Sequence, residues 1–298
     1  MELPDNYGVF KSLVKSRIRT YCDTKIWPFD IEVVHAWLGN FDSEIDEYVA
    51  LQLLDSLIVR SKEMAISSYQ TLFNSLLWQV LKENDILRDT DLLEWISKLK
   101  SGRLAHLIKF LPVKIENEHG ESGSTIYRML SSILETNYYA FTPSTNAPKA
   151  LILIDDFLGS GRQFTDQFAA EFKLDEQIKH MTIIYCPLVA LESGICNLIE
   201  RFPKLIVLPC EVLKDEHAFL NVNQTSLFKN DQKNTVKDVI AHFMTMKEKY
   251  APKSSYWMGD NDSCIPIVFQ WGCPNQAPSI LWHRSDRGNW NQLFGRRL

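Results

Sequence analysis

The sequence predicts an α/β fold that has a central, mainly parallel sheet, a helical N-terminal accessory region and a tryptophan-rich C-terminal segment. Beyond about residue 107, strand-like apolar runs alternate with helical patterns, which is typical of parallel strands joined by helical crossovers. One of these runs, Leu151 to Ile154, is continuously apolar, as expected for a strand that is buried on both faces. The first 100 residues instead show helical spacing and contain glycine only at Gly8 and Gly39.

Length and composition are those of a globular protein. The chain has 298 residues, of which 45% are hydrophobic, so it can bury a substantial core in one large domain or two modest ones. We place a helical N-terminal region at residues 1–104 and an α/β domain, which includes the tryptophan-rich segment, at residues 105–298. The net charge of -5 argues against indiscriminate binding to nucleic acid. Because no apolar run approaches the ~20 residues needed to cross a bilayer, and no secretion signal is evident, we expect a cytoplasmic protein without membrane contact.

Three helical segments are expected in the N-terminal region. In Phe41 to Val59, Ser43 can cap a helix, and apolar residues then return at helical spacing. Similar patterns predict helices over Ser61–Leu81 and Asp89–Leu99. We expect these helices to form an accessory layer on the sheet.

Further strands and helices complete the predicted α/β domain. We expect strands over Phe110–Ile115, Met181–Cys186 and Lys204–Pro209, and helices over Leu188–Phe202 and Thr235–Tyr250. The last strand contains the apolar run Leu205–Leu208, so we expect it to be central in the sheet.

The run from Leu151 to Ile154 is followed by two carboxylates and a glycine-rich turn. Asp155 and Asp156 are expected at the carboxyl end of the strand, where open α/β sheets bind their ligands. The turn Gly159–Gln163 can direct successive backbone N–H groups inward and lead into a helix near Phe164 or Thr165, which makes it a candidate phosphate cradle. The same order of residues also occurs where acids cap the next helix or bind a metal, so the residues alone leave these alternatives open.

The segment Leu151–Gln163 resembles the ribose-phosphate signature of type I phosphoribosyltransferases, in which four apolar residues precede two acids, two apolar residues and a loop of small residues. The resemblance implies that Asp155 and Asp156 hold the ribose hydroxyls of phosphoribosyl pyrophosphate. Their proximity to the reacting sugar adds the hypothesis that one of them takes a proton from the incoming nucleophile. The turn would then bind the 5-phosphate through Gly159, Ser160, Gly161, Arg162 and Gln163. Gln163 stands where the family usually has threonine, although its amide can still donate to phosphate. Mg²⁺ is expected to enter with the phosphorylated ligand, without direct ligation by the protein.

Two loops are candidates for further ligand contacts. In type I phosphoribosyltransferases the loop after the first sheet strand contacts pyrophosphate, which implies this role for Ser122, Gly123 and Ser124. Alternatively, Ser122 or Ser124 caps the next helix, and one residue can do both. The irregular segment Asn137–Lys149 is interpreted either as a loop that closes over the reaction, with Tyr138, Tyr139 and Lys149 as contributors, or as a solvated connection.

Short motifs at both ends of the chain carry a second resemblance. The C-terminal part contains P-N-x-x-P-x-x-x-W from Pro274 to Trp282, and the N-terminal part contains W-x-x-x-F from Trp37 to Phe41 and A-L-Q-L-L from Ala50 to Leu54. These motifs resemble those of PRTase-CE, a phosphoribosyltransferase-like family that is encoded in bacterial conflict and phage-defence loci. In such a fold, Trp271, Asn275 and Trp282 are available to cover the nucleotide as a hood, and packing in the core is the alternative for the tryptophans.

The resemblance implies a phosphoribosyltransferase-like effector in bacterial anti-phage defence. It would bind phosphoribosyl pyrophosphate or a related nucleotide and transfer or cleave the ribosyl phosphate linkage, with a defence-system partner such as the reverse transcriptase of a retron. The alternative is a catalytically silent sensor or scaffold that signals by binding a nucleotide. Gln163 and the lack of an obvious catalytic lysine in the loop 137–149 favour the sensor, whereas the intact pair of Asp155 and Asp156 favours the enzyme.

Overall fold

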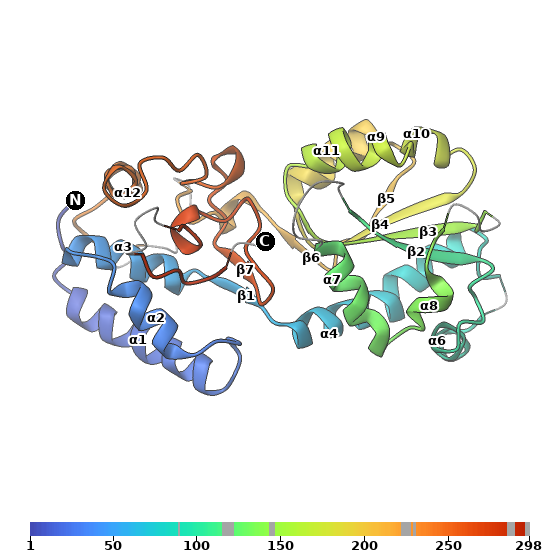
Figure 1. The fold of residues 1–298 in the computed structure, drawn as a ribbon, viewed down its shortest axis with the longest axis horizontal. Coiled ribbons are helices and arrows are strands. Elements are labelled where there is room, and N and C mark those ends of the chain that lie inside the picture. Colours follow the sequence, from blue (N-terminus) through green and yellow to red (C-terminus); the bar gives the residue numbers. More distant parts are fainter. Residues whose placement is uncertain are drawn as a thin grey trace. The chain divides into compact units, whose positions relative to one another are not determined.

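The computed structural model describes residues 1–88, 90–114, 122–142, 147–221, 228, 231–284 and 290–295 (Figure 1), and for Ser122 it describes the backbone alone. The chain divides into two compact units. Unit 1 consists of Met1–Ser61 and Asp215–Leu298, and unit 2 consists of Lys62–Lys214. Among the described residues, no helix combines the length and the apolar character that a bilayer crossing requires.

Unit 2 contains a sheet of five strands that are all paired in parallel. The strands follow the order β2 (Ile108–Pro112), β3 (Ala150–Leu158), β4 (Thr182–Leu191) and β5 (Ile206–Val207), and β6 (Glu211–Leu213) also pairs with β4. In β3, the side chains from Leu151 to Ile154 are fully buried, as their continuous apolar character predicts for a strand covered on both faces. The predicted α/β class with a central parallel sheet is therefore confirmed.

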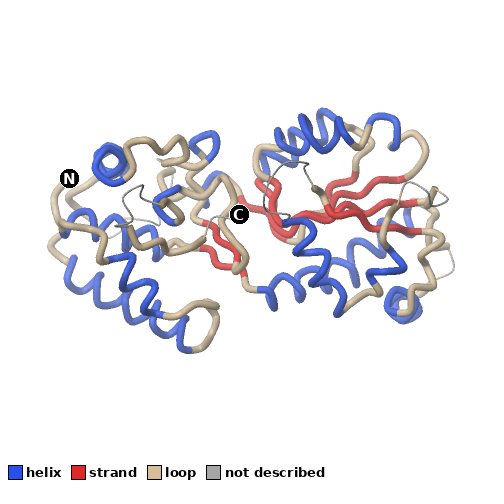
Figure 2. Tube along the Cα trace, in the orientation of Figure 1, coloured by secondary structure: helices blue, strands red, loops and turns tan. Residues whose placement is uncertain are grey.

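Helices cover both faces of this sheet (Figures 1 and 2). One face carries α9 (Ala169–Glu171), α10 (Leu174–Gln177), α11 (Glu192–Arg201) and the π-helical turn η3 (Phe164–Phe168). The other face carries α4 (Lys62–Leu72), α7 (Ser122–Met129) and α8 (Thr136–Tyr139). The remaining helical elements of unit 2 are η1 (Phe73–Leu77), α5 (Trp78–Glu83), α6 (Leu92–Lys100) and η2 (Leu130–Ser132). The fold thus has the three layers that a parallel sheet with helical crossovers produces.

Unit 1 joins the N-terminal helices to the C-terminal segment in one hydrophobic core. Its helical elements are α1 (Tyr7–Asp23), α2 (Ile31–Leu38), α3 (Glu44–Asp55), η4 (Asp215–His217), α12 (Val236–Tyr250), η5 (Asp260–Asp262) and η6 (Ser279–Leu281), and its strands are β1 (Ile58–Arg60) and β7 (Ile267–Phe269). The two strands pair in parallel, with Val59 opposite Val268. The Trp37 indole donates a hydrogen bond of 3.0 Å to the carbonyl oxygen of Ile280. The two ends of the sequence therefore stabilise each other.

The unit boundaries fall at Ser61 and Lys214, whereas the junction predicted from the sequence lies between residues 104 and 105. The difference arises because the helices that follow residue 61 pack on the sheet. The rings of Phe73 and Phe110, the latter in β2, have their centroids 5.6 Å apart, and the Trp95 indole donates to the Phe73 carbonyl oxygen at 2.9 Å. The predicted helical region is thus split between the two units.

A buried carboxylate ties α3 to α12 within unit 1. Asp46 is 4% exposed and accepts hydrogen bonds from His242 Nε2 at 2.7 Å, Lys249 Nζ at 3.0 Å and the Tyr250 hydroxyl at 2.7 Å. Burial by itself raises the pKa of Asp46, but the hydrogen bonds outweigh burial and hold the pKa below its usual value of 3.8. Folding therefore favours the ionised form of Asp46.

The substitution Asp46→Asn is expected to lower the free energy of unfolding by about 2 kcal/mol near neutral pH, somewhat less than breaking a fully buried pair costs, because Lys249 is partly exposed. Because folding lowers the pKa of Asp46, its contribution is complete well above pH 3.8 and is lost as the pH falls below that value. Urea unfolding of both proteins as a function of pH measures the difference, which should shrink in acid. The control Asp30→Asn removes an exposed pair with Lys25 and should change stability by less than about 0.5 kcal/mol.

Candidate functional site

The acid pair of the predicted signature lies in the part of β3 that extends beyond β2. β2 ends at Pro112, opposite Ile154, whereas β3 and β4 stay paired as far as Leu158 and Ala190. The acids therefore lie in the carboxyl-terminal part of β3, as predicted, although the strand continues for two residues after Asp156. The strand continues because Leu158, which is 2% exposed, still has β4 beside it and apolar side chains to pack against.

The two acids differ in their surroundings. Asp155 lies on the face covered by α9 to α11, because its carboxylate accepts a hydrogen bond from Tyr185, which belongs to the apolar cluster on that face. Asp155 is half-buried, whereas Asp156 is 2% exposed.

Both carboxylate oxygens of Asp155 have a hydrogen-bond donor. The Tyr185 hydroxyl donates to Oδ2 at 2.8 Å, and the backbone N–H of Asp156 donates to Oδ1 at 2.9 Å. Burial and the neighbouring Asp155 carboxylate raise the pKa of Tyr185 well above its usual value, so the phenol keeps the proton that it donates. On the main chain, the Tyr69 hydroxyl of α4 lies 2.6 Å from the Asp155 carbonyl oxygen and 2.9 Å from that of Cys186. Neither tyrosine belongs to the predicted site, because each is distant from the acids in sequence.

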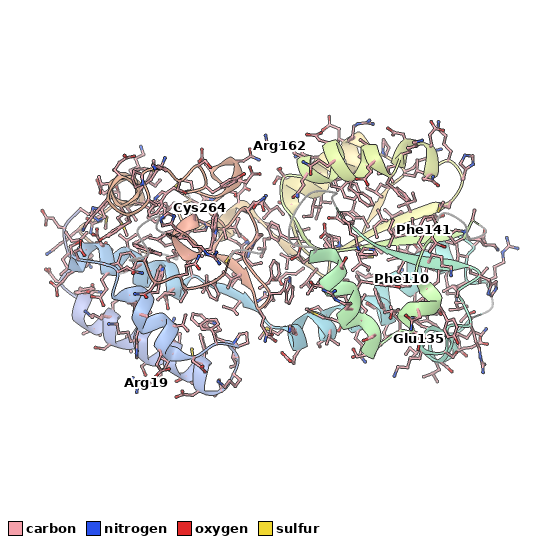
Figure 3. All side chains as sticks on the ribbon, viewed as in Figure 1. Arg19, Phe110, Glu135, Phe141, Arg162 and Cys264 are labelled. Atoms are coloured by element: carbon pink, nitrogen blue, oxygen red, sulfur yellow. The ribbon has the colours of Figure 1, made fainter. Side chains whose placement is uncertain are left out.

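The turn after β3 contains a glycine with left-handed backbone geometry and leads directly into a helix. Gly161 has a φ of +83°, a conformation that glycine adopts without steric cost. Its carbonyl oxygen accepts the Thr165 N–H at 2.9 Å, and helical backbone begins at Arg162, two residues before the earliest predicted start. Arg162 and Gln163 are exposed, and Figure 3 labels Arg162 in unit 2 near α11. The turn therefore presents two polar side chains at the start of a helix, where an anion is favoured.

Close backbone packing against α11 holds this turn in place. A Cβ atom on Gly194 would lie 1.9 Å from the carbonyl oxygen of Gly159, so the helix approaches the turn as closely as only glycine permits. The Asn197 side-chain amide also donates to the Ser160 carbonyl oxygen at 3.0 Å. Gly194 is absent from the predicted site. The available signal was the cost of a glycine inside a predicted helix, which indicates a packing reason where no other is evident.

The start of α7 packs against β3 next to the acid pair. A Cβ atom on Gly123 would lie 2.4 Å from the Val113 carbonyl oxygen and 3.0 Å from that of Ile154, the residue before Asp155. Ser124 is 7% exposed, and its Oγ has no hydrogen-bond partner within the described part of the chain. The first N–H groups of a helix lack intrahelical acceptors and carry partial positive charge, which favours an anion.

The structure thus brings two predicted elements together, the acids and the loop–helix junction. The capping role considered for Ser124 is not seen, because Ser124 is the third residue of α7. The Ser122 side chain and the polar loop at residues 116–121 lie outside the described residues.

The described residues of the segment 137–149 connect elements and fill the core. Tyr139 is fully buried and its hydroxyl donates to the Lys98 carbonyl oxygen at 3.1 Å. Tyr138 is 62% exposed. The backbone N–H of Lys149 donates to the Leu107 carbonyl oxygen at 2.8 Å, which leads the chain into β3. These contacts favour the interpretation as a connection, and residues 143–146 lie outside the described part.

The described C-terminal tryptophans belong to unit 1. Trp257 and Trp282 are 2% and 9% exposed and lie in its hydrophobic core, which confirms core packing for these two. The Trp257 indole donates to the Phe243 carbonyl oxygen at 2.9 Å. Trp271 stacks on Phe269 with ring centroids 5.0 Å apart and an interplanar angle of 16°. Trp282 therefore fills the core instead of forming a hood, and a hood role stays a prediction for Trp271 and Asn275.

Comparison with known proteins adds one informative match. No curated protein matches the chain. Among solved structures, the AQ2163 protein from Aquifex aeolicus is 15% identical, with a TM-score of 0.26, over 37% of this chain and 56% of that chain. The family model PRTase-CE matches residues 34–296, which include all of unit 2 with the acid pair and most of unit 1. The match covers most of the sequence and agrees with the motifs at its two ends, and the chain therefore belongs to the PRTase-CE family.

Proposed function

We propose that unit 2 binds phosphoribosyl pyrophosphate or a related nucleotide and transfers or cleaves its ribosyl phosphate linkage. The observation that carries the proposal is the junction of β3 with the start of α7, where Gly123 packs on the carbonyl oxygen of Ile154 and Asp155 and Asp156 follow directly. Carboxylates that can accept hydrogen bonds from hydroxyls thus adjoin a helix start that favours an anion. A sugar diol that carries a diphosphate has both of the groups that such a site would recognise.

Such a transfer requires of the protein mainly that it bind the substrate and stabilise the charge that develops in the transition state. The anomeric carbon acquires oxocarbenium character as the diphosphate leaves, so the protein must hold the ribose and stabilise the departing anion. Asp155 and Asp156 would hold the ribose hydroxyls, and the start of α7 with Ser124 would donate to the diphosphate. The turn Gly159–Gln163 would hold the 5-phosphate at its own helix start.

Mg²⁺ fits this arrangement as a companion of the ligand. No three His, Cys, Asp or Glu side chains in the described ranges are grouped as metal ligands. The carboxylates of Asp155 and Asp156 offer oxygen atoms, which Mg²⁺ prefers, and Mg²⁺ usually keeps several of its waters at phosphate sites. We therefore propose that the ion enters with the diphosphate and that these two acids hold it indirectly. When bound, it would neutralise charge on the leaving group.

A second candidate function is a catalytically silent nucleotide sensor or scaffold. One structural observation favours it, namely that both oxygens of the Asp155 carboxylate already accept hydrogen bonds within the protein. An acid held in this way is better suited to binding a hydroxyl than to taking its proton.

The two candidates are separated by incubating the protein with Mg²⁺ and phosphoribosyl pyrophosphate, nicotinamide dinucleotide or common nucleotides. Binding is measured by calorimetry and consumption by liquid chromatography. Binding with consumption supports the enzyme, and binding without consumption supports the sensor. If none of these compounds binds, the proposed function is wrong in both forms.

Membership of PRTase-CE supports a role in bacterial anti-phage defence. We propose an effector that acts in the cytoplasm under the control of a partner, such as the reverse transcriptase of a retron. Phage plating on cells that carry the complete locus tests this role, with wild type compared to the double substitution Asp155→Asn and Asp156→Asn. Loss of protection is expected, and unchanged protection would exclude the acids from the biological mechanism.

The substitution Ser124→Ala is expected to act with opposite signs on stability and on binding. An unsatisfied buried hydroxyl costs about 1–3 kcal/mol, so its removal should raise the free energy of unfolding of the free protein by about 1 kcal/mol. Pyrophosphate affinity, measured by calorimetry with Mg²⁺, should fall about tenfold because a donor to a charged group is lost. The control Ser132→Ala removes an exposed hydroxyl that bonds to Met129 and should change neither quantity. A lower stability of Ser124→Ala would contradict the assignment.

A further inference from the structure

We propose that Tyr185 is a positioning residue that fixes the Asp155 carboxylate for recognition of a ligand hydroxyl and couples it to the phosphate turn. The inference rests on the proposed function, because it concerns the same ligand site. It adds a residue of β4 that lies 30 positions from Asp155 in sequence and outside the ribose-phosphate signature.

The hydrogen bonds of Asp155 restrict how its carboxylate can turn. Tyr185 is 1% exposed, and its hydroxyl donates to Oδ2 at 2.8 Å. The backbone N–H of Asp156 donates to Oδ1 at 2.9 Å. Two donors on different oxygens, one from β4 and one from β3 itself, hold the plane of the carboxylate. Because a carboxylate has about four lone-pair sites, these two hydrogen bonds by themselves do not use the full acceptor capacity of either oxygen.

The Tyr185 ring also contacts the element that begins at the phosphate turn. Its centroid lies 4.6 Å from that of Phe164, with an interplanar angle of 32°. Phe164 directly follows the turn Gly159–Gln163 and is 4% exposed. Tyr185 therefore touches Asp155 with its hydroxyl and the first residue after the turn with its ring. A ligand that moves the turn would shift Phe164 and, through the ring contact, Tyr185.

The hydrogen bond from Tyr185 suits Asp155 to binding a ligand hydroxyl. Donors aimed at a carboxylate favour its ionised form, and an ionised carboxylate accepts hydrogen bonds from hydroxyls. Tyr69 differs from Tyr185 in this respect, because its hydroxyl lies against the main-chain carbonyl oxygens of Asp155 and Cys186 and not against a carboxylate. Tyr69 therefore contacts the main chain of β3 and β4, whereas Tyr185 orients the side chain of Asp155.

The test compares Tyr185→Phe with Tyr139→Phe. Both substitutions remove one hydroxyl and keep the ring, and Tyr139 is a buried tyrosine of the same unit whose hydroxyl bonds to the backbone of Lys98. Calorimetry with Mg²⁺ measures the affinity for phosphoribosyl pyrophosphate and, separately, for inorganic pyrophosphate. We expect Tyr185→Phe to lower the affinity for phosphoribosyl pyrophosphate about tenfold and to leave the affinity for pyrophosphate unchanged within about twofold. Tyr139→Phe should leave both affinities unchanged.

Two additional variants make the test decisive. With Asp155→Asn in place, Tyr185→Phe should cause no further loss, because both changes act on one contact. If Tyr185→Phe does not fold, 4-fluorophenylalanine at position 185 keeps the size of the tyrosine without the donor and replaces it in the test.

The outcomes separate this inference from the proposed function. If wild type binds neither ligand, the proposed function fails and the inference fails with it. If wild type binds phosphoribosyl pyrophosphate and Tyr185→Phe leaves the affinity within twofold, only the positioning role is wrong. Equal losses for phosphoribosyl pyrophosphate and pyrophosphate would indicate a general disturbance of unit 2 and would also overturn the positioning role.

Discussion

Combined substitution of Asp155→Asn and Asp156→Asn is expected to reduce the affinity for phosphoribosyl pyrophosphate at least about 100-fold while the protein stays folded. Each carboxylate would accept a hydrogen bond from a ribose hydroxyl, and hydrogen bonds to charged groups contribute about 1.5–3 kcal/mol each. Two such bonds contribute about 3–6 kcal/mol, which is at least about 100-fold in the dissociation constant. Asparagine has nearly the size of aspartate, so the packing around β3 is kept.

Calorimetry with Mg²⁺ measures this loss, and thermal unfolding followed by circular dichroism verifies the fold. The matched control is Asp175→Asn with Glu176→Gln, a second pair of adjacent acids in unit 2. These side chains are exposed in α10 and make surface ion pairs with Arg201 and Lys179, so the same change of charge should leave affinity unchanged. An affinity of the Asp155 and Asp156 variant within about threefold of wild type would contradict the assignment of the acids.

The centre of the sheet is predictable from local sequence, and the sheet edge is not. Leu151–Ile154 is fully buried in β3, as its continuous apolar character predicts. Leu205–Leu208 has the same character and was expected to be central, yet β5 contains only Ile206–Val207 and ends the strand order with half-buried side chains. An apolar run indicates that a segment is kept from water. It does not indicate whether a strand lies on each side of it.

The pairing of strands that are distant in sequence cannot be predicted from the local sequence pattern. β1 and β7 pair although Ile58 and Ile267 lie more than 200 positions apart, and this pairing joins the two ends of the chain in unit 1. The same limit applies to the candidate site. Its acids and turn are contiguous in sequence and could be predicted, whereas Tyr185 and Gly194 reach them only through the packing of β4 and α11.

The substitution Gly194→Ala tests whether the packing of α11 holds the turn Gly159–Gln163 in place. We expect it to lower both the free energy of unfolding and the affinity for phosphoribosyl pyrophosphate. Alanine in a helix is favoured over glycine by about 1 kcal/mol. The added Cβ would lie 1.9 Å from the Gly159 carbonyl oxygen, so either α11 or the turn must move. Overpacking of this kind costs about 1–3 kcal/mol or more, and a clash with backbone lies at the upper end. The cost of the clash therefore exceeds the gain in helix propensity, and the free energy of unfolding should fall by about 2 kcal/mol.

The control Gly8→Ala separates the effect of the clash from that of helix propensity. Gly8 lies in α1, and nothing lies within 4 Å of an added Cβ. Alanine there should raise the free energy of unfolding by up to about 1 kcal/mol. If Gly194→Ala also stabilises the protein and keeps its affinity for phosphoribosyl pyrophosphate, α11 does not hold the turn. If it lowers that affinity about tenfold or more, the position of the turn sets the strength of 5-phosphate binding, and Gly194 joins Asp155 and Asp156 as a determinant of the site.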